Sequence, residues 1–204
     1  MFRYTPKTGD IVVDVGAGTG EMTLLFSRRV GSAGRVISIE AHPRMFHCLQ
    51  ETCTRNHLEN VVLLNYAIMD SDARVLISDR AANRTNDILE ANSGLPVHGC
   101  TLDKVIESLD LPRIDFLKMN IEGAERMAIE GMSETIKITR NVCIFCHDFL
   151  AVQEGRDEMR TKSAVIAFLE RNGFDMTIQE WDPQPWVQDT VYGFNKNMSA
   201  SLLR

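Results

Sequence analysis

Several features that would settle the class of this protein are absent from its sequence. No apolar run approaches the roughly 20 residues that span a bilayer, and residues 1–10 lack the pattern of a secretory signal peptide. Basic residues are not in excess, since 22 Lys and Arg stand against 28 Asp and Glu, a formal net charge of −6. A chain of this charge has no general electrostatic reason to bind nucleic acid or an anionic membrane. We therefore expect a cytoplasmic protein that binds neither.

The sequence has five cysteines, an odd number. Five cysteines without an export signal argue against a fold built on disulfides. Cys143, Cys146 and His147 do spell C-x-x-C-H, the attachment pattern of c-type haem. However, residues 141–149 read as a strand, on which residues three apart point to opposite faces, and such haem attachment requires an exported chain. We expect these cysteines to be buried, small apolar side chains.

The apolar pattern predicts an α/β protein. The length of 204 residues favours one domain, here residues 1–204, against a prior of about 150 residues per domain. Strand-like runs alternate with stretches of helical periodicity, which is typical of a parallel sheet covered by helices. We expect main strands at 11–15, 35–40, 61–68, 114–121 and 141–149, a short extra strand at 74–78, and helices at 21–30, 43–56, 101–109, 124–132 and 162–172.

Two regions depart from this alternation. A polar insertion at about 78–100 shows little periodicity, and connections of that length often contact substrate. Near the end, the strand-like runs 174–181 and 186–194 are joined only by residues 182–185, and so short a connection forces antiparallel pairing. The prediction is a Rossmann-like, doubly wound mixed sheet of about seven strands, with an antiparallel C-terminal hairpin and helices on both faces.

The turn after the first strand is the most informative segment. It reads D-V-G-A-G-T-G over residues 14–20, and Glu40 ends the second strand about 20 residues later. Glycines allow a ligand to approach the backbone, the following helix start offers free N–H groups, and an acidic side chain at that distance accepts hydrogen bonds from ribose hydroxyls. A plain tight turn is the alternative, but the combination with Glu40 favours a ribose-containing ligand.

The glycine spacing narrows the choice of ligand. Dinucleotide sites carry G-x-G-x-x-G, whereas this turn carries G-x-G-x-G with Asp14 ahead of it. A carboxylate is a poor neighbour for a pyrophosphate and suits a cationic ligand such as S-adenosylmethionine, which has ammonium and sulfonium groups. The predicted cofactor-binding residues are Asp14, Gly16, Ala17, Gly18, Thr19, Gly20, Glu40 and Ala67.

This turn, with Glu40, resembles motif I and the acidic ribose-binding position of class I methyltransferases, and the terminal hairpin fits that fold. A narrower resemblance, over roughly residues 9–150, is to the FkbM family of methyltransferases. It is carried by G-D-I-V-V-D-V-G-A at 9–17, T-L-D at 101–103 and D-F-L-K-M-N-I-E-G-A-E at 115–125. Asn120 stands where that family normally has Asp. The resemblance implies methyl transfer from S-adenosylmethionine, most often to a hydroxyl of a sugar or natural product.

Polar residues at the carboxyl ends of the fourth and fifth strands are the predicted catalytic group: Lys118, Asn120, Glu122, His147 and Asp148. Lys118 lies in an apolar strand and requires a partner, for which Glu122, Glu125 and Asp148 are the candidates. His147 is the first candidate for the base that takes the proton of an acceptor hydroxyl, and Glu122 the second. A divalent cation on His, Asp and Glu side chains is an alternative, but the spacing does not support it and we predict no metal site.

Three functions remain open at this point. The first is O-methylation of a small hydroxylated acceptor. The second is a cofactor-binding module without catalysis, suggested by Asn120 and by the short stretch before the first strand. The third is a nicotinamide-dependent oxidoreductase, disfavoured by Asp14 and the glycine spacing. The short stretch before the first strand also leaves open a homo-oligomer, in which a partner subunit covers the site. Trp181 and Trp186 are expected to pack at the sheet edge or a subunit contact, or to stack on a sugar.

Overall fold

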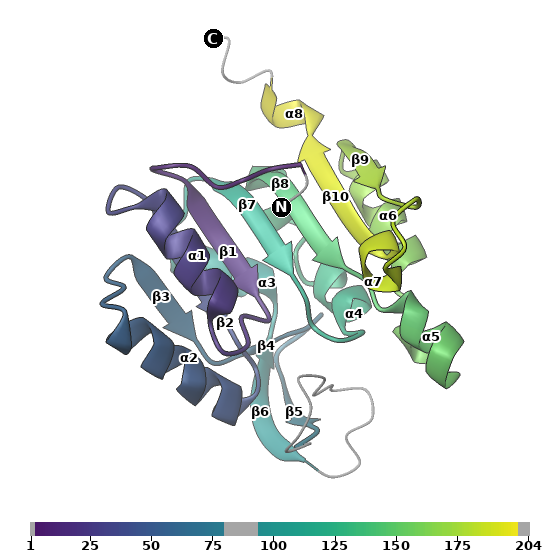
Figure 1. Ribbon diagram of the computed structural model, residues 1–204, viewed down its shortest axis with the longest axis horizontal. Helices are drawn as coiled ribbons and strands as arrows, with labels where there is room; N and C mark the ends of the chain where they lie inside the picture. The colour runs from purple at the N-terminus through teal and green to yellow at the C-terminus, as the bar shows by residue number, and fades with distance from the viewer. Residues whose placement is uncertain (1–2, 80–93, 200–204) are drawn as a thin grey trace.

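A computed structural model describes residues 3–79 and 94–199 of the chain. Within these ranges, the main sheet has seven strands in the order β3-β2-β1-β7-β8-β10-β9 (Figure 1). Neighbouring strands are parallel except for β10, which is antiparallel to both β8 and β9. The main strands are β1 (Ile11–Val15), β2 (Arg35–Ile39), β3 (Val61–Leu64), β7 (Ile114–Met119), β8 (Thr139–Phe145), β9 (Phe174–Ile178) and β10 (Thr190–Asn195).

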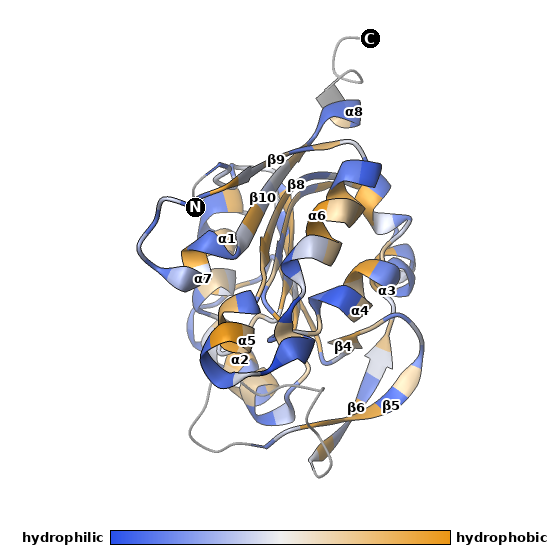
Figure 2. Ribbon diagram, turned by 90° about the vertical axis from the view of Figure 1, so that its right-hand side faces the viewer, coloured by the Kyte–Doolittle hydropathy of each residue, from blue (hydrophilic) through white to orange (hydrophobic). Residues whose placement is uncertain are grey.

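Helices cover both faces of this sheet. Figure 2 shows α1 and α2 on one side of the strands and α3, α4 and α6 on the other. The predicted doubly wound mixed sheet is therefore confirmed. The helices are α1 (Glu21–Val30), α2 (Pro43–Arg55), α3 (Leu102–Ser108), α4 (Glu125–Glu130), α5 (Asp148–Glu154), α6 (Lys162–Arg171), α7 (Pro185–Gln188) and α8 (Lys196–Ser199), with short 3-10 turns at Thr135–Ile138 and Asp157–Met159. In the described ranges, no helix is long and apolar enough to cross a membrane.

Alternation along β1 divides the core between the two faces. Val13 and Val15 pack in the larger cluster under α3, α4 and α6, whereas Val12 packs on the other face with Phe26 of α1 and Phe116 of β7. Successive strand residues point to opposite faces, so Asp14 lies on the α1 face with Val12. The same alternation places Lys118 on that face beside Phe116. One face of the sheet thus carries a polar pair within an apolar layer.

The run 61–68, predicted as one strand, is two strands in two sheets. β3 ends at Leu64, and β4 (Ala67–Ile68) joins a second sheet of order β4-β6-β5 with β5 (Ala73–Ile77) and β6 (Leu95–Cys100). The chain turns at Asn65, whose side chain donates hydrogen bonds to the carbonyls of Glu40 and Ala41. The short strand predicted at 74–78 corresponds to β5.

Part of the predicted polar insertion is regular structure. β6 pairs antiparallel with β5 and parallel with β4, and its alternation of exposed Pro96 and His98 with buried Val97 and Gly99 is the period-two pattern of a half-buried strand. The prediction of little periodicity was wrong for this part because the alternating residues include Pro and Gly, which are poor strand formers. Residues 80–93 of the predicted insertion lie outside the described ranges.

The C-terminal strands pair as predicted but are shorter. β9 ends at Ile178 and β10 begins at Thr190, so Trp181 and Trp186 lie outside both strands. The connection contains α7, which Pro185 begins, and Gln188 of this helix donates a hydrogen bond to the carbonyl of Asp182 at 2.6 Å. The prediction of a four-residue loop was therefore wrong, although the antiparallel pairing is confirmed. β10 also lies between β8 and β9.

The fifth predicted strand also ends early. β8 stops at Phe145, and His147 immediately precedes α5, which starts at Asp148. These two residues were expected to end the strand; instead they begin a helix that the sequence analysis did not predict. Cys143 and Cys146 are buried in the clusters of opposite sheet faces, and all five cysteines are free. The C-x-x-C-H spacing is thus a feature of the core.

Candidate functional site

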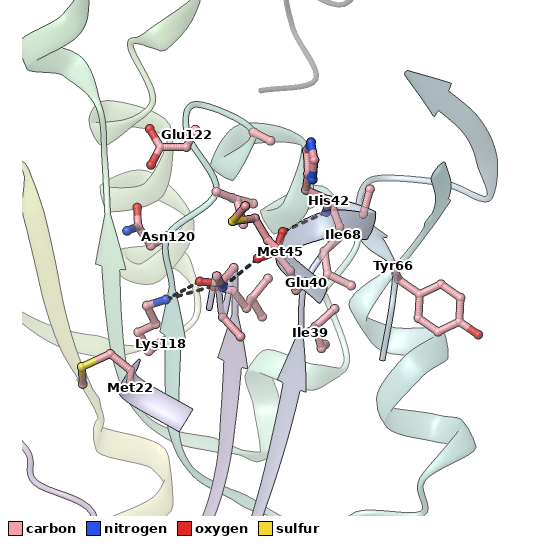
Figure 3. A pocket seen from close by; sticks show the side chains of 18 of the residues that line it. Met22, Ile39, Glu40, His42, Met45, Tyr66, Ile68, Lys118, Asn120 and Glu122 are labelled. Atoms are coloured by element: carbon pink, nitrogen blue, oxygen red, sulfur yellow. Dashed lines mark hydrogen bonds between the residues drawn. The ribbon is translucent and has the colours of Figure 1, made fainter. Parts of the chain in front are cut away.

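A cavity of about 300 Å³ opens at the carboxyl ends of β1, β2 and β7 (Figure 3). β1 lies between β2 and β7, so the strand order reverses there, and ligands of open α/β sheets bind at this point. The turns after these three strands form most of the lining, and β4 and β5 of the second sheet add to it. The lining residues are Val15–Thr19, Glu21, Met22, Ile39–His42, Met45, Tyr66–Ile68, Ile77, Lys118, Asn120–Glu122, Ala124 and Phe145.

The three glycines of the turn after β1 all have positive φ angles, of 73° at Gly16, 57° at Gly18 and 93° at Gly20. They differ in what surrounds them. A Cβ at Gly16 would lie 1.9 Å from the carbonyl oxygen of Asn120, and one at Gly20 would lie 2.8 Å from Leu49. At Gly18 such an atom would have no neighbour within 4 Å. Gly16 and Gly20 are therefore needed for packing within the protein, and Gly18 leaves its backbone open to the cavity.

Glu40 fixes this turn from the end of β2. One carboxylate oxygen accepts the N–H of Gly18 at 2.7 Å, and the other accepts the N–H of His42 at 2.8 Å. Burial raises the pKa of Glu40, and these two backbone hydrogen bonds counteract part of that rise. Each oxygen can accept a further hydrogen bond. The residue thus holds the turn and still presents acceptors to the cavity.

The structure assigns a different role to Asp14 from the predicted one. Asp14 is fully buried and is not part of the lining; its Oδ1 lies 3.0 Å from Nζ of Lys118, and its Oδ2 accepts a hydrogen bond from Thr23. Lys118 also donates to the carbonyl of Gly16 at 2.7 Å. The prediction that Asp14 meets a cationic ligand was wrong, because Lys118 on the neighbouring strand supplies the cation. Lys118, predicted to be catalytic, supports the glycine turn through this pair.

The turn between β7 and α4 brings two polar side chains to the cavity. The N–H of Asn120 donates to the carbonyl of Val15, and its Oδ1 is buried without a hydrogen-bond partner among the described residues. Glu122 has a φ angle of 53°, which is rare outside glycine and costs on the order of 1–3 kcal/mol. Figure 3 shows both side chains at one end of the cavity, with Tyr66 at the other.

His147 lies behind this turn and is not part of the cavity lining. Its Nδ1 is 3.1 Å from Oε1 of Glu125, and its Nε2 is 3.4 Å from Oε2 of Glu122. Burial alone would lower its pKa, but the hydrogen bonds and charges of Glu122 and Glu125 outweigh it and raise the pKa to about 10. A protonated imidazole cannot accept a proton. The geometry therefore does not support His147 as the general base.

Asp148 also lies away from the cavity. Its carboxylate accepts the N–H groups of Thr161 and Lys162, both at 2.9 Å, at the start of α6. These N–H groups have no partner within their own helix, so Asp148 caps α6 from outside it. The prediction that Asp148 belongs to a catalytic cluster fails for this reason.

The site also contains residues to which the sequence analysis gave no role. His42, Met45, Tyr66 and Ile68 line the side of the cavity formed by α2 and the β3–β4 connection, close to the predicted Ala67. His42 accepts the N–H of Arg44 at the start of α2. The place of His42, two residues after Glu40 and directly before Pro43, could have indicated from the sequence that it lines the cavity. The places of Tyr66 and Ile68 could not, because they depend on the chain leaving the main sheet after β3.

The cofactor implied by the resemblance, S-adenosylmethionine, can be tested against these residues. It carries ribose hydroxyls, an ammonium and a sulfonium. Glu40 offers acceptors for the hydroxyls, Gly18 leaves backbone open for close approach, and the unpartnered Oδ1 of Asn120 is an acceptor in the same cavity. The carboxylates of Glu21, Glu40 and Glu122 line the cavity, whereas Lys118 is already paired with Asp14. The cavity thus fits a cationic nucleoside, and in the described part of the chain no group of three His, Cys, Asp or Glu side chains is arranged to hold a metal ion.

Two sequence relatives and one solved structure that resemble this chain are named as methyltransferases. Protein-L-isoaspartate O-methyltransferase of Caenorhabditis elegans is 27% identical over 88 residues, which are 43% of this chain and 39% of that protein. Hexuronic acid methyltransferase AglP of Haloferax volcanii is 25% identical over 140 residues, 68% of this chain and 56% of that protein. The crystal structure of methyltransferase FkbM from Methylobacillus flagellatus superposes with a TM-score of 0.63 at 18% identity, covering 95% of this chain and 45% of that one.

The chain thus spans less than two thirds of the length of each of these proteins. A family-level match covers most of it: the methyltransferase FkbM domain matches residues 14–176, from the buried aspartate of β1 through β8 and α6 into β9. This range contains the glycine turn, Glu40 and the β7–α4 turn that together form the cavity. The chain belongs to the family of FkbM methyltransferase domains.

Proposed function

We propose that this chain transfers a methyl group from S-adenosylmethionine to a hydroxyl of a sugar or another small molecule. The observation that carries the proposal is the arrangement of the cavity. Gly18 and Glu40, which suit a nucleoside, lie in the same 300 Å³ space as Asn120 and Glu122, two polar side chains suited to a second ligand. The name of the Haloferax relative, a hexuronic acid methyltransferase, supports a sugar acceptor.

The chain's own residues would divide the work as follows. The Gly18 backbone and Glu40 hold the nucleoside, and Lys118 keeps the glycine turn in place through Asp14 and the Gly16 carbonyl. When bound, S-adenosylmethionine supplies the activated methyl group. Methyl transfer is an in-line displacement, so the acceptor oxygen must be held in line with the methyl group. Asn120 and Glu122 lie where they can orient a hydroxyl, and such orientation is itself a large part of the rate.

Binding and transfer can be measured separately. Calorimetry should show binding of S-adenosylmethionine and S-adenosylhomocysteine but not of NAD, and the Glu40→Ala variant should bind about 1–3 kcal/mol more weakly, because charge-assisted hydrogen bonds are lost. Mass spectrometry of a panel of methyl glycosides and hexuronates should then reveal a product 14 mass units heavier, the mass of one CH₂ group. Binding without any product would favour the alternative of a cofactor-binding module, and binding of NAD alone would refute the proposal.

A further inference from the structure

Glu122 presents a carboxylate to the cavity from a strained position. It has a positive φ angle, Gly123 follows with another, and its side chain is 18% exposed. Strain of this kind persists only where the surroundings determine the conformation, and it concentrates at functional sites. The contacts of the Glu122 carboxylate show which residues hold this conformation.

Those contacts join three charged side chains in a row. His147 places one ring nitrogen against each of two carboxylates, Glu122 on the cavity side and Glu125 on the core side. Glu125 is fully buried and is held in turn, since Oε1 accepts the N–H of Ile121 and Oε2 accepts the hydroxyl of Thr161. Two carboxylates and one imidazolium leave one net negative charge, and the only member of the three that lines the cavity is Glu122.

Other acidic groups near His147 have partners of their own and do not take the place of Glu122 and Glu125. Asp148 is bound to the two N–H groups at the start of α6, and Asp189 accepts the N–H of Phe149 at 2.7 Å. The thiol of Cys146 is neutral, because burial raises its pKa. The imidazolium therefore interacts with Glu122 and Glu125, which stand on either side of it.

We infer that Glu122 is the group that binds the acceptor hydroxyl and takes its proton, and that His147 and Glu125 are positioning residues that hold its carboxylate at the cavity. This inference rests on the proposed function. As the bond between the acceptor oxygen and the methyl group forms and the methyl–sulfur bond breaks, the O–H bond of the acceptor also breaks and its proton moves to the Glu122 carboxylate; S-adenosylhomocysteine is the other product. Asn120, which cannot take a proton, orients the hydroxyl.

The kinetic test uses the full chain and the methyl glycoside panel. Glu122→Gln should lower kcat about 10²–10⁴-fold, the usual contribution of a positioned base, with a much smaller change in the Kd for S-adenosylmethionine. His147→Gln should lower kcat at least about tenfold, and this effect should vanish in the double variant with Glu122→Gln, because both act through one carboxylate. Glu130→Gln, which changes an exposed carboxylate at the end of α4, the helix that follows Glu122, is the matched control and should be unchanged. Full turnover in Glu122→Gln, or additive effects in the double variant, would overturn the inference.

A second measurement needs no acceptor. Nitrogen-15 NMR of the imidazole at about pH 8 should find both ring nitrogens of His147 protonated, and Glu122→Gln should lower the pKa of this imidazole. If no glycoside is methylated although S-adenosylmethionine binds, the proposed acceptor chemistry fails, and the NMR result still decides whether His147 holds Glu122 as a cation. A neutral imidazole in the unsubstituted protein would refute the positioning role.

Discussion

Two positions in the turn after β1 require glycine, for different reasons. A Cβ atom at Gly16 would lie 1.9 Å from the carbonyl oxygen of Asn120, so no side chain fits there. Gly18 faces open space, and only its φ angle of 57° disfavours other residues. The sequence predicts that both approach the ligand. In the structure both glycines line the cavity, and Gly16 in addition contacts the backbone of a second turn of the protein.

We therefore expect the two alanine variants to differ. Gly16→Ala should lower the melting temperature strongly, because a backbone carbonyl must move, whereas Gly18→Ala should cost only about 1–2 kcal/mol for its left-handed conformation and should mainly weaken S-adenosylmethionine binding. Thermal unfolding and calorimetry on both variants check this. Equal losses of stability would show that Gly18 is also needed for packing.

His147 predicts a specific pH dependence of stability. Its pKa is raised to about 10 in the folded protein, against about 6.5 for an unfolded histidine. The folded chain thus binds this proton more tightly, so the stabilisation is complete below about pH 6.5 and declines as the pH rises toward 10, by up to about 1.4 kcal/mol per pH unit. Urea unfolding of the natural protein and His147→Gln at several pH values should show a difference that shrinks over this window. A constant difference would contradict the charged state.

One carboxylate joins the starts of the helices α5 and α6. Asp148, the first residue of α5, accepts two N–H groups from the start of α6. Asp148→Ala should therefore lower the free energy of unfolding by about 0.5–2 kcal/mol, whereas Asp148→Asn, which keeps an acceptor, should lose much less. Denaturant unfolding measures both. S-adenosylmethionine affinity should be unaffected in either variant, and a loss of affinity would return Asp148 to the binding site.

The elements also show where sequence-based prediction works and where it stops. β1 and α1 match their predicted bounds because their signals are local: an apolar run, a glycine turn and amphipathic periodicity. Asp14 and Lys118 are 104 positions apart, and only the β1–β7 pairing places them side by side. Periodicity identifies a buried lysine that requires a partner but does not choose among distant carboxylates. The same holds for His147, whose partners depend on where α4 and α6 pack.

At the scale of the whole molecule, the thiols report whether the core is closed. Cys48 on α2 is exposed, and Cys53, Cys100, Cys143 and Cys146 are buried. Burial raises the pKa of Cys100 to about 11 and that of Cys143 to about 12, so these two are thiols, not reactive thiolates, at neutral pH. We expect a chromogenic disulfide reagent to modify one cysteine rapidly in the native protein, and Cys48→Ser to abolish that phase. Several rapidly reacting thiols would indicate that the sheet opens readily.

The position of β10 has a consequence for how the protein is made. The ribosome synthesises β9 before β10, yet β9 pairs with the main sheet only through β10, which is inserted between it and β8. A nascent chain that has reached β9 therefore exposes the outer edge of β8 together with a strand that has nowhere to pair. Unpaired strand edges are templates for aggregation. This half of the sheet can close only after residues 190–195 have left the ribosome, and until then its unpaired edge is open to aggregation.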